Sequence, residues 1–145
     1  MAQRRNKISL VIMGTTGTGK STLANSLLGL PINANDTRAE RFKMSAGARG
    51  CTMRCSAKEG YLLGDRSKPI RIIDTPGHGD GHNDNFSLRE EIVKGMKAEK
   101  EVHAFIWAKN SEAPRMDSND REFMEIFSEI FGPGFSKNMV VIFTR

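Results

Sequence analysis

"GTTGTGKS", residues Gly14 to Ser21, is the stretch that decides the fold. It matches the pattern G-x-x-x-x-G-K-[ST] in full. Glycines let backbone N–H groups turn inward around a phosphate, where side chains would collide with it. An apolar run, Ile8 to Met13, precedes the pattern, and a helix-like segment, Lys20 to Leu30, follows it. A strand before and a helix after are the context in which this pattern forms a phosphate-binding loop.

The loop predicts a site for a nucleoside triphosphate with Mg²⁺. Lys20 supplies a mobile positive charge for the β- and γ-phosphates and is a candidate catalytic residue, while Ser21 offers its hydroxyl to Mg²⁺. The N-terminus of the following helix adds its positive dipole end. The predicted nucleotide contacts in this region are Gly14, Thr15, Thr16, Gly17, Thr18, Gly19, Lys20, Ser21 and Thr22.

A second motif, "IIDTPGHGD" at residues 72–80, follows at the end of a predicted strand. Asp74 can reach Mg²⁺ through a water molecule, as the carboxylate of a Walker-B motif does. Gly77 can present its N–H to a γ-phosphate and move when that phosphate leaves. A threonine between the two motifs would complete the Mg²⁺ site; Thr52, in "RGCTMRC", is the candidate and Thr37 the alternative. The order of these motifs favours a GTPase switch.

His78 is the second candidate catalytic residue, because it directly follows the glycine of the switch motif. An imidazole there could orient the attacking water by hydrogen bonding. The alternative is a histidine of the switch loop without a catalytic role. His78, Asp80, His82 and Asp84 also have metal-like spacing, but we interpret them as a solvated segment and not as a metal site.

The rest of the chain alternates strands with helices. Strands are expected at residues 8–13, within 52–63, and at 70–73, 102–107 and 139–143. Helices are expected at 20–30, from a capping box formed by Ser87 and Glu90, and near 122–131. The apolar residues at helical spacing are predicted to face the core: Leu88, Ile92, Val93, Met96, Phe123, Ile126, Phe127 and Ile130. The pattern predicts an α/β fold, a P-loop NTPase three-layer sandwich with a mostly parallel sheet.

Composition excludes several other classes of protein. The 145 residues are enough for one domain, and no apolar run approaches the roughly 20 residues that span a bilayer. The net charge of +5 is spread along the chain without a block of basic residues interleaved with aromatics, so we expect no nucleic-acid partner. Cys51 and Cys55 are too few for a disulfide framework and fit a cytoplasmic, reducing setting. His103 is interpreted as a core or interface residue of a buried strand.

The stretch "GTTGTGKSTLANSLLG" resembles the phosphate loop and first helix of the GTPases of immunity-associated proteins, the GIMAP or IAN family. The resemblance continues through "CTMRC", "IIDTPG", "VHAFIWA" and "FGPGFSKNMVVIFTR". It implies a septin-like guanine-nucleotide switch that binds GTP or GDP with Mg²⁺, hydrolyses GTP slowly and can form a homodimer or oligomer on GTP loading. Members of the family can be membrane-linked through C-terminal segments, which this chain does not support.

In that family the last stretch carries a guanine motif, T-[KR]-x-D, and Thr144 and Arg145 match its start. We therefore expect residues 1–7 to be a basic N-terminal tail and residues 8–145 a G domain that is incomplete at its C-terminus, without its final strand and helix. Two alternatives stay open. One is a nucleotide-dependent scaffold with negligible turnover; the other is another P-loop NTPase, such as an Era-like GTPase or an ATPase.

Overall fold

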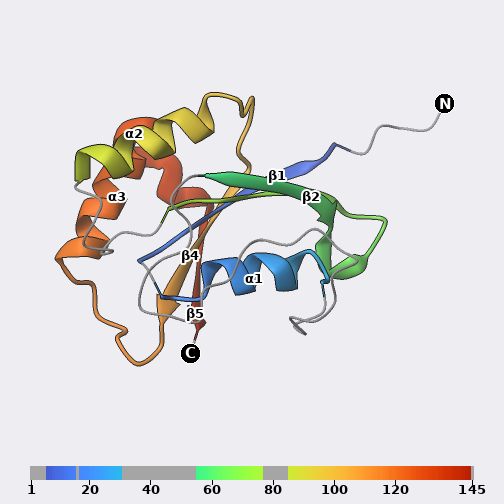
Figure 1. The fold of residues 1–145 in the computed structure, drawn as a ribbon, viewed down its shortest axis with the longest axis horizontal. Coiled ribbons are helices and arrows are strands. Elements are labelled where there is room, and N and C mark those ends of the chain that lie inside the picture. Colours follow the sequence, from blue (N-terminus) through green and yellow to red (C-terminus); the bar gives the residue numbers. More distant parts are fainter. Residues whose placement is uncertain (1–5, 16, 31–54, 77–84, 145) are drawn as a thin grey trace.

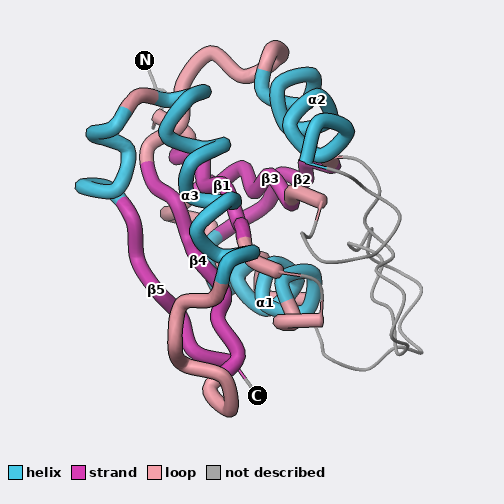
Figure 2. The backbone as a smooth tube through the Cα atoms, turned by 90° about the vertical axis from the view of Figure 1, so that its left-hand side faces the viewer, coloured by secondary structure: helices cyan, strands magenta, loops and turns pink. Residues whose placement is uncertain are grey.

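The computed structural model describes residues 6–15, 17–30, 55–76 and 85–144. These residues form a five-stranded sheet with helices on both faces (Figure 1). Helix α1 covers one face, and α2 and α3 cover the other (Figure 2). The predicted three-layer α/β architecture is therefore confirmed.

The strands are β1 (Ile8–Met13), β2 (Ser56–Tyr61), β3 (Pro69–Asp74), β4 (Ala104–Asn110) and β5 (Met139–Thr144). The α-helices are α1 (Lys20–Leu27), α2 (Asn85–Met96) and α3 (Ser118–Phe131). Two short 3₁₀ helices, Leu62–Gly64 and Pro133–Asn138, lie between strands β2 and β3 and between α3 and β5.

The sheet has the strand order β2-β3-β1-β4-β5, with β1 in the centre. β1 pairs in parallel with β3 and β4, and β5 pairs in parallel with β4. Only β2 among the described strands is antiparallel, pairing Ser56 with Asp74 at one end and Tyr61 with Pro69 at the other. β2 is antiparallel because it reaches β3 through a short turn, whereas a parallel neighbour needs a crossover connection.

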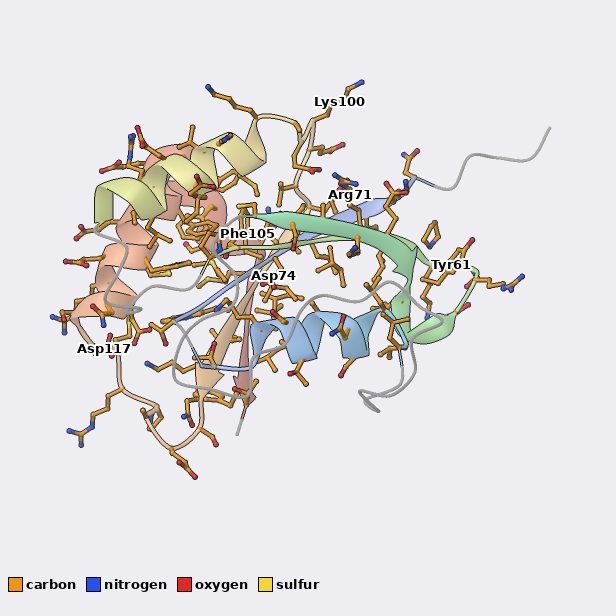
Figure 3. The ribbon with its side chains drawn as sticks, viewed as in Figure 1. Tyr61, Arg71, Asp74, Lys100, Phe105 and Asp117 are labelled. Carbon is orange, nitrogen blue, oxygen red and sulfur yellow. The ribbon has the colours of Figure 1, made fainter. Side chains whose placement is uncertain are left out.

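Apolar side chains fill both layers between the sheet and the helices. On the α1 face, Ile12 and Ile72 pack with Ala24 of the helix. On the other face, Phe105 of β4 meets the aromatic rings of α3, with ring centroids 4.9 Å from Phe131 (Figure 3). The predicted aromatic stripe of α3 is core, since Phe123, Ile126 and Phe127 are buried and Ile130 packs against them.

Helix boundaries differ from the prediction in three places. α2 begins two residues before Ser87, so the predicted capping box there is wrong. The capping box lies instead at α3, where Asp117 Oδ1 accepts from the Asp120 amide at 2.8 Å and Asp120 Oδ2 accepts from the Asp117 amide at 3.1 Å. α1 ends at Leu27 and not near Leu30, because Gly29 adopts a left-handed φ of 69° that a helix does not continue through.

One strand prediction also changes. β4 begins at Ala104, so His103 precedes it; its side chain is 34% exposed and its Nδ1 accepts from the Ser9 amide at 2.9 Å. The interpretation of His103 as a buried strand residue is therefore wrong. β5 lies at the edge of the sheet, which leaves Val140 and Phe143 more than half exposed.

Candidate functional site

The phosphate loop lies at the carboxyl ends of the parallel strands, between β1 and α1 (Figure 1). Gly17 and Gly19 have left-handed φ values of 81° and 79°, which side chains other than hydrogen disfavour. Gly14 is required for a different reason, because a Cβ there would lie 2.4 Å from the carbonyl oxygen of Ala108 in β4. The glycine spacing thus reflects backbone turns at two positions and a close strand contact at the third.

The loop is closed on the carbonyl oxygen of Thr15. This oxygen accepts from the Thr18 hydroxyl at 2.9 Å and from Lys20 Nζ at 3.2 Å, and the Thr18 amide lies 3.4 Å away. The Lys20 side chain is only 7% exposed. Burial lowers the pKa of Lys20, and the negative charge of Asp74 acts against that shift. A buried cation thus stands at the loop with a carboxylate near enough to affect it.

Ser21 and Asp74 meet across the site. The Ser21 hydroxyl donates to Asp74 Oδ2 at 2.7 Å, although the two residues are 53 positions apart in the sequence. Asp74 ends β3 and is 1% exposed; Figure 3 shows it near the start of α1. Thr75 fixes the chain directly after it, because its hydroxyl donates to the Ile12 carbonyl at 2.7 Å. A hydroxyl and a carboxylate are the hard oxygen ligands that Mg²⁺ prefers, so the pair fits the predicted cation.

Thr144 ties the end of β5 to the loop. Its hydroxyl donates to the carbonyl oxygen of Thr18, and the same hydroxyl oxygen lies 3.4 Å from the carbonyl oxygen of Lys109. Its own carbonyl accepts from the Ser111 amide at 2.7 Å. We predicted Thr144 as a nucleotide contact; the structure places it against the backbone of the phosphate loop.

Other predicted residues are less informative. Thr22 is exposed in the first turn of α1. Cys55 is a half-buried free thiol directly before β2 and donates to the Glu91 carbonyl at 3.6 Å. The following lie outside the described residues, so their roles stay predictions: Thr16, Thr37, Cys51, Thr52, Gly77, His78, Asp80, His82, Asp84 and Arg145.

Sequence reasoning missed one buried ion pair near the site. Lys109, at 6% exposure in β4, contacts Asp120 of α3, which is 1% exposed. The available signal was a lysine directly after the apolar run "AFIWA", where a charge requires a partner.

A protein-family model, the AIG1 family, matches residues 8–145. The chain belongs to the AIG1 family. Immune-associated nucleotide-binding protein 7 of Arabidopsis thaliana is 31% identical over 137 residues, which are 94% of this AIG1-family chain and 40% of that protein. This confirms the resemblance to immunity-associated proteins.

Solved structures agree on the fold. Toc33 from Arabidopsis thaliana, in complex with GDP and Mg²⁺, has a TM-score of 0.72 at 21% identity, covering 95% of this chain and 50% of Toc33. A second structure concerns the chloroplast translocon components atToc33 and psToc159, for which dimerization is described as important for GTPase activity; it has a TM-score of 0.72 at 20% identity, over 95% of this chain and 50% of that one. The AIG1-family chain thus spans about half of these solved chains. Within its described residues, no helix is long and apolar enough to cross a membrane.

Proposed function

We propose that this chain is a guanine-nucleotide-binding switch that binds GTP or GDP with Mg²⁺ and hydrolyses GTP slowly. The observation that carries the proposal is the Ser21–Asp74 hydrogen bond of 2.7 Å. It joins the phosphate loop to the second motif, as a nucleotide site with Mg²⁺ requires. Membership of the AIG1 family and the GDP and Mg²⁺ bound by Toc33 support the same function.

Each described residue of the site has a role in this proposal. The turned backbone between Gly14 and Gly19 presents N–H groups to the phosphates, and Lys20 supplies the positive charge. The Ser21 hydroxyl and Asp74 hold Mg²⁺, with Asp74 acting through a water. When bound, Mg²⁺ neutralises charge on the β- and γ-phosphates.

Outside the described residues we keep the roles proposed from the motifs. Thr52 completes the Mg²⁺ site, Gly77 senses the γ-phosphate and His78 orients the attacking water. Arg145, next to Thr144, belongs to the proposed guanine motif. A cytoplasmic location and no nucleic-acid partner are proposed on composition.

Mg²⁺ dependence tests the site. Fluorescently labelled GTP is titrated with and without Mg²⁺, against the unchanged chain and the Asp74→Asn variant. We expect Mg²⁺ to tighten binding by about tenfold in the unchanged chain and by less than about twofold in the variant, since the carboxylate that holds Mg²⁺ through a water loses its charge. The matched control is Asp65→Asn, in the β2–β3 turn, where Asp65 pairs with Lys68 and accepts from the Ser67 amide. Equal Mg²⁺ dependence of all three chains would refute the proposal.

Base preference is a separate question. Thr144 and Arg145 match the first two positions of the proposed guanine motif T-[KR]-x-D, and its aspartate is not among these 145 residues. We therefore expect the 145 residues to discriminate poorly between GTP and ATP in competition binding. A preference for GTP of about a hundredfold, worth roughly 2.7 kcal/mol, would show that the base is read by other residues.

Self-association on GTP loading is proposed from the Toc33 relatives, for which dimerization is described as important for GTPase activity. A turnover assay over a range of protein concentrations tests it. A rate per molecule that rises with concentration supports an associating GTPase. Measurable nucleotide binding with no turnover at any concentration would favour the alternative, a nucleotide-dependent scaffold.

A further inference from the structure

The ion pair of Lys109 and Asp120 joins the carboxyl end of β4 to the start of α3. Lys109 Nζ donates to Asp120 Oδ2, and this oxygen also accepts from the Asp117 amide at 3.1 Å. Both side chains are more than nine-tenths buried. Asp120 Oδ1 makes no hydrogen bond within the described part of the chain, so the buried carboxylate depends on the lysine for its charge compensation.

The strand end that carries Lys109 also supports the phosphate loop at two points. The carbonyl of Ala108 lies so close to Gly14 that a Cβ there would be 2.4 Å from it. The carbonyl of Lys109 lies 3.4 Å from the Thr144 hydroxyl, which donates to Thr18 of the loop. The first part of the loop therefore lies directly against Ala108, and the central part is linked to Lys109 through Thr144 of β5.

We propose that Lys109 and Asp120 form a positioning pair for nucleotide binding: they fix the end of β4 against α3 and so hold the phosphate loop in its binding shape. Neither residue touches the nucleotide in this proposal. The inference rests on the proposed function, because it assigns a role within the same site.

The reason for a charged pair is directional. An apolar contact between β4 and α3 would tolerate small sliding, whereas a buried lysine must meet a buried carboxylate at hydrogen-bond distance. Asp120 is itself held by the α3 capping box, because its backbone N–H donates to Asp117 Oδ1 at 2.8 Å. The first turn of α3, which follows the labelled Asp117 in Figure 3, thereby fixes the position of Lys109.

The test measures two quantities for the 145-residue chain and for each variant: the affinity for labelled GDP, and the melting temperature without nucleotide. Lys109→Met leaves Asp120 as an uncompensated buried carboxylate, and we expect GDP affinity to fall at least about fivefold. Lys109→Met combined with Asp120→Asn removes both charges; we expect it to regain the melting temperature of the unchanged chain but not its GDP affinity, because the directional contact is still missing. If Lys109→Met does not fold, Asp120→Asn alone gives the same comparison, because it keeps the shape of the side chain.

The matched control is Ile126→Val, in the buried face of α3 but outside the ion pair. It lowers stability by loss of one methylene, and we expect its GDP affinity to stay within about twofold of the unchanged chain. Equal loss of affinity in Ile126→Val and Lys109→Met would reduce the pair to general stabilisation and overturn the inference. Unchanged affinity in Lys109→Met overturns the inference alone, whereas absence of GDP binding by the unchanged chain refutes the proposed function as well.

Discussion

Replacing Lys20 by methionine should change binding and stability in opposite directions. Methionine keeps the unbranched shape of the side chain and removes its charge. A charge-assisted contact to phosphate contributes roughly 1.5–3 kcal/mol, so triphosphate affinity should fall by about 10- to 150-fold. In the ligand-free protein, however, burial lowers the pKa of Lys20, which means that the fold disfavours the protonated form.

Lys20→Met relieves that desolvation and loses one hydrogen bond to Thr15, of about 1 kcal/mol net. We therefore expect the ligand-free free energy of unfolding to stay equal or to rise by up to about 1 kcal/mol. Titration of labelled triphosphate measures the first effect, and urea unfolding without nucleotide measures the second. Lys97→Met, on the exposed end that follows α2, is the matched control for loss of a positive charge. Binding by Lys20→Met within about twofold of the unchanged chain would refute the phosphate role.

Three further predictions each concern one residue. Burial raises the pKa of Cys55 to about 12, so between about pH 9 and 12 the unfolded thiol loses its proton before the folded one. The free energy of unfolding should then fall with rising pH by up to about 1.4 kcal/mol per unit, and Cys55→Ala should flatten this slope in urea unfolding. Gly14→Ala places a Cβ 2.4 Å from the Ala108 carbonyl and should weaken labelled-nucleotide binding by more than about tenfold, whereas Gly134→Ala, with open space around it, should not. His78→Ala should slow single-turnover hydrolysis without changing triphosphate affinity; equal rates would favour a histidine without a catalytic role.

Much of the site could be predicted because its two motifs each follow a strand. Parallel strands bring their carboxyl ends to one edge of the sheet, so Ser21 after β1 and Asp74 at the end of β3 had to be neighbours. The strand Ile8–Met13 also had the predicted bounds, since the phosphate-loop glycine Gly14 ends its apolar run.

Other features depend on packing that no local pattern contains. The α3 capping box uses two aspartates, Asp117 and Asp120. The usual pattern of a serine followed three residues later by a glutamate occurs instead at Ser87, which lies inside α2, so no capping box forms there. The partner of Lys109 became evident only when α3 was placed against β4.

Strands β2 and β5 lie at opposite edges of the sheet (Figure 2), and the two edges differ in their side chains. β2 carries Lys58 and Glu59, and charges of this kind discourage pairing with another chain. β5, "MVVIFT", carries no charge and exposes Val140, Val141 and Phe143. Among the described strands, β5 is therefore the edge on which the backbone of a second chain would meet no charge. Association through this edge would respond to protein concentration with or without nucleotide.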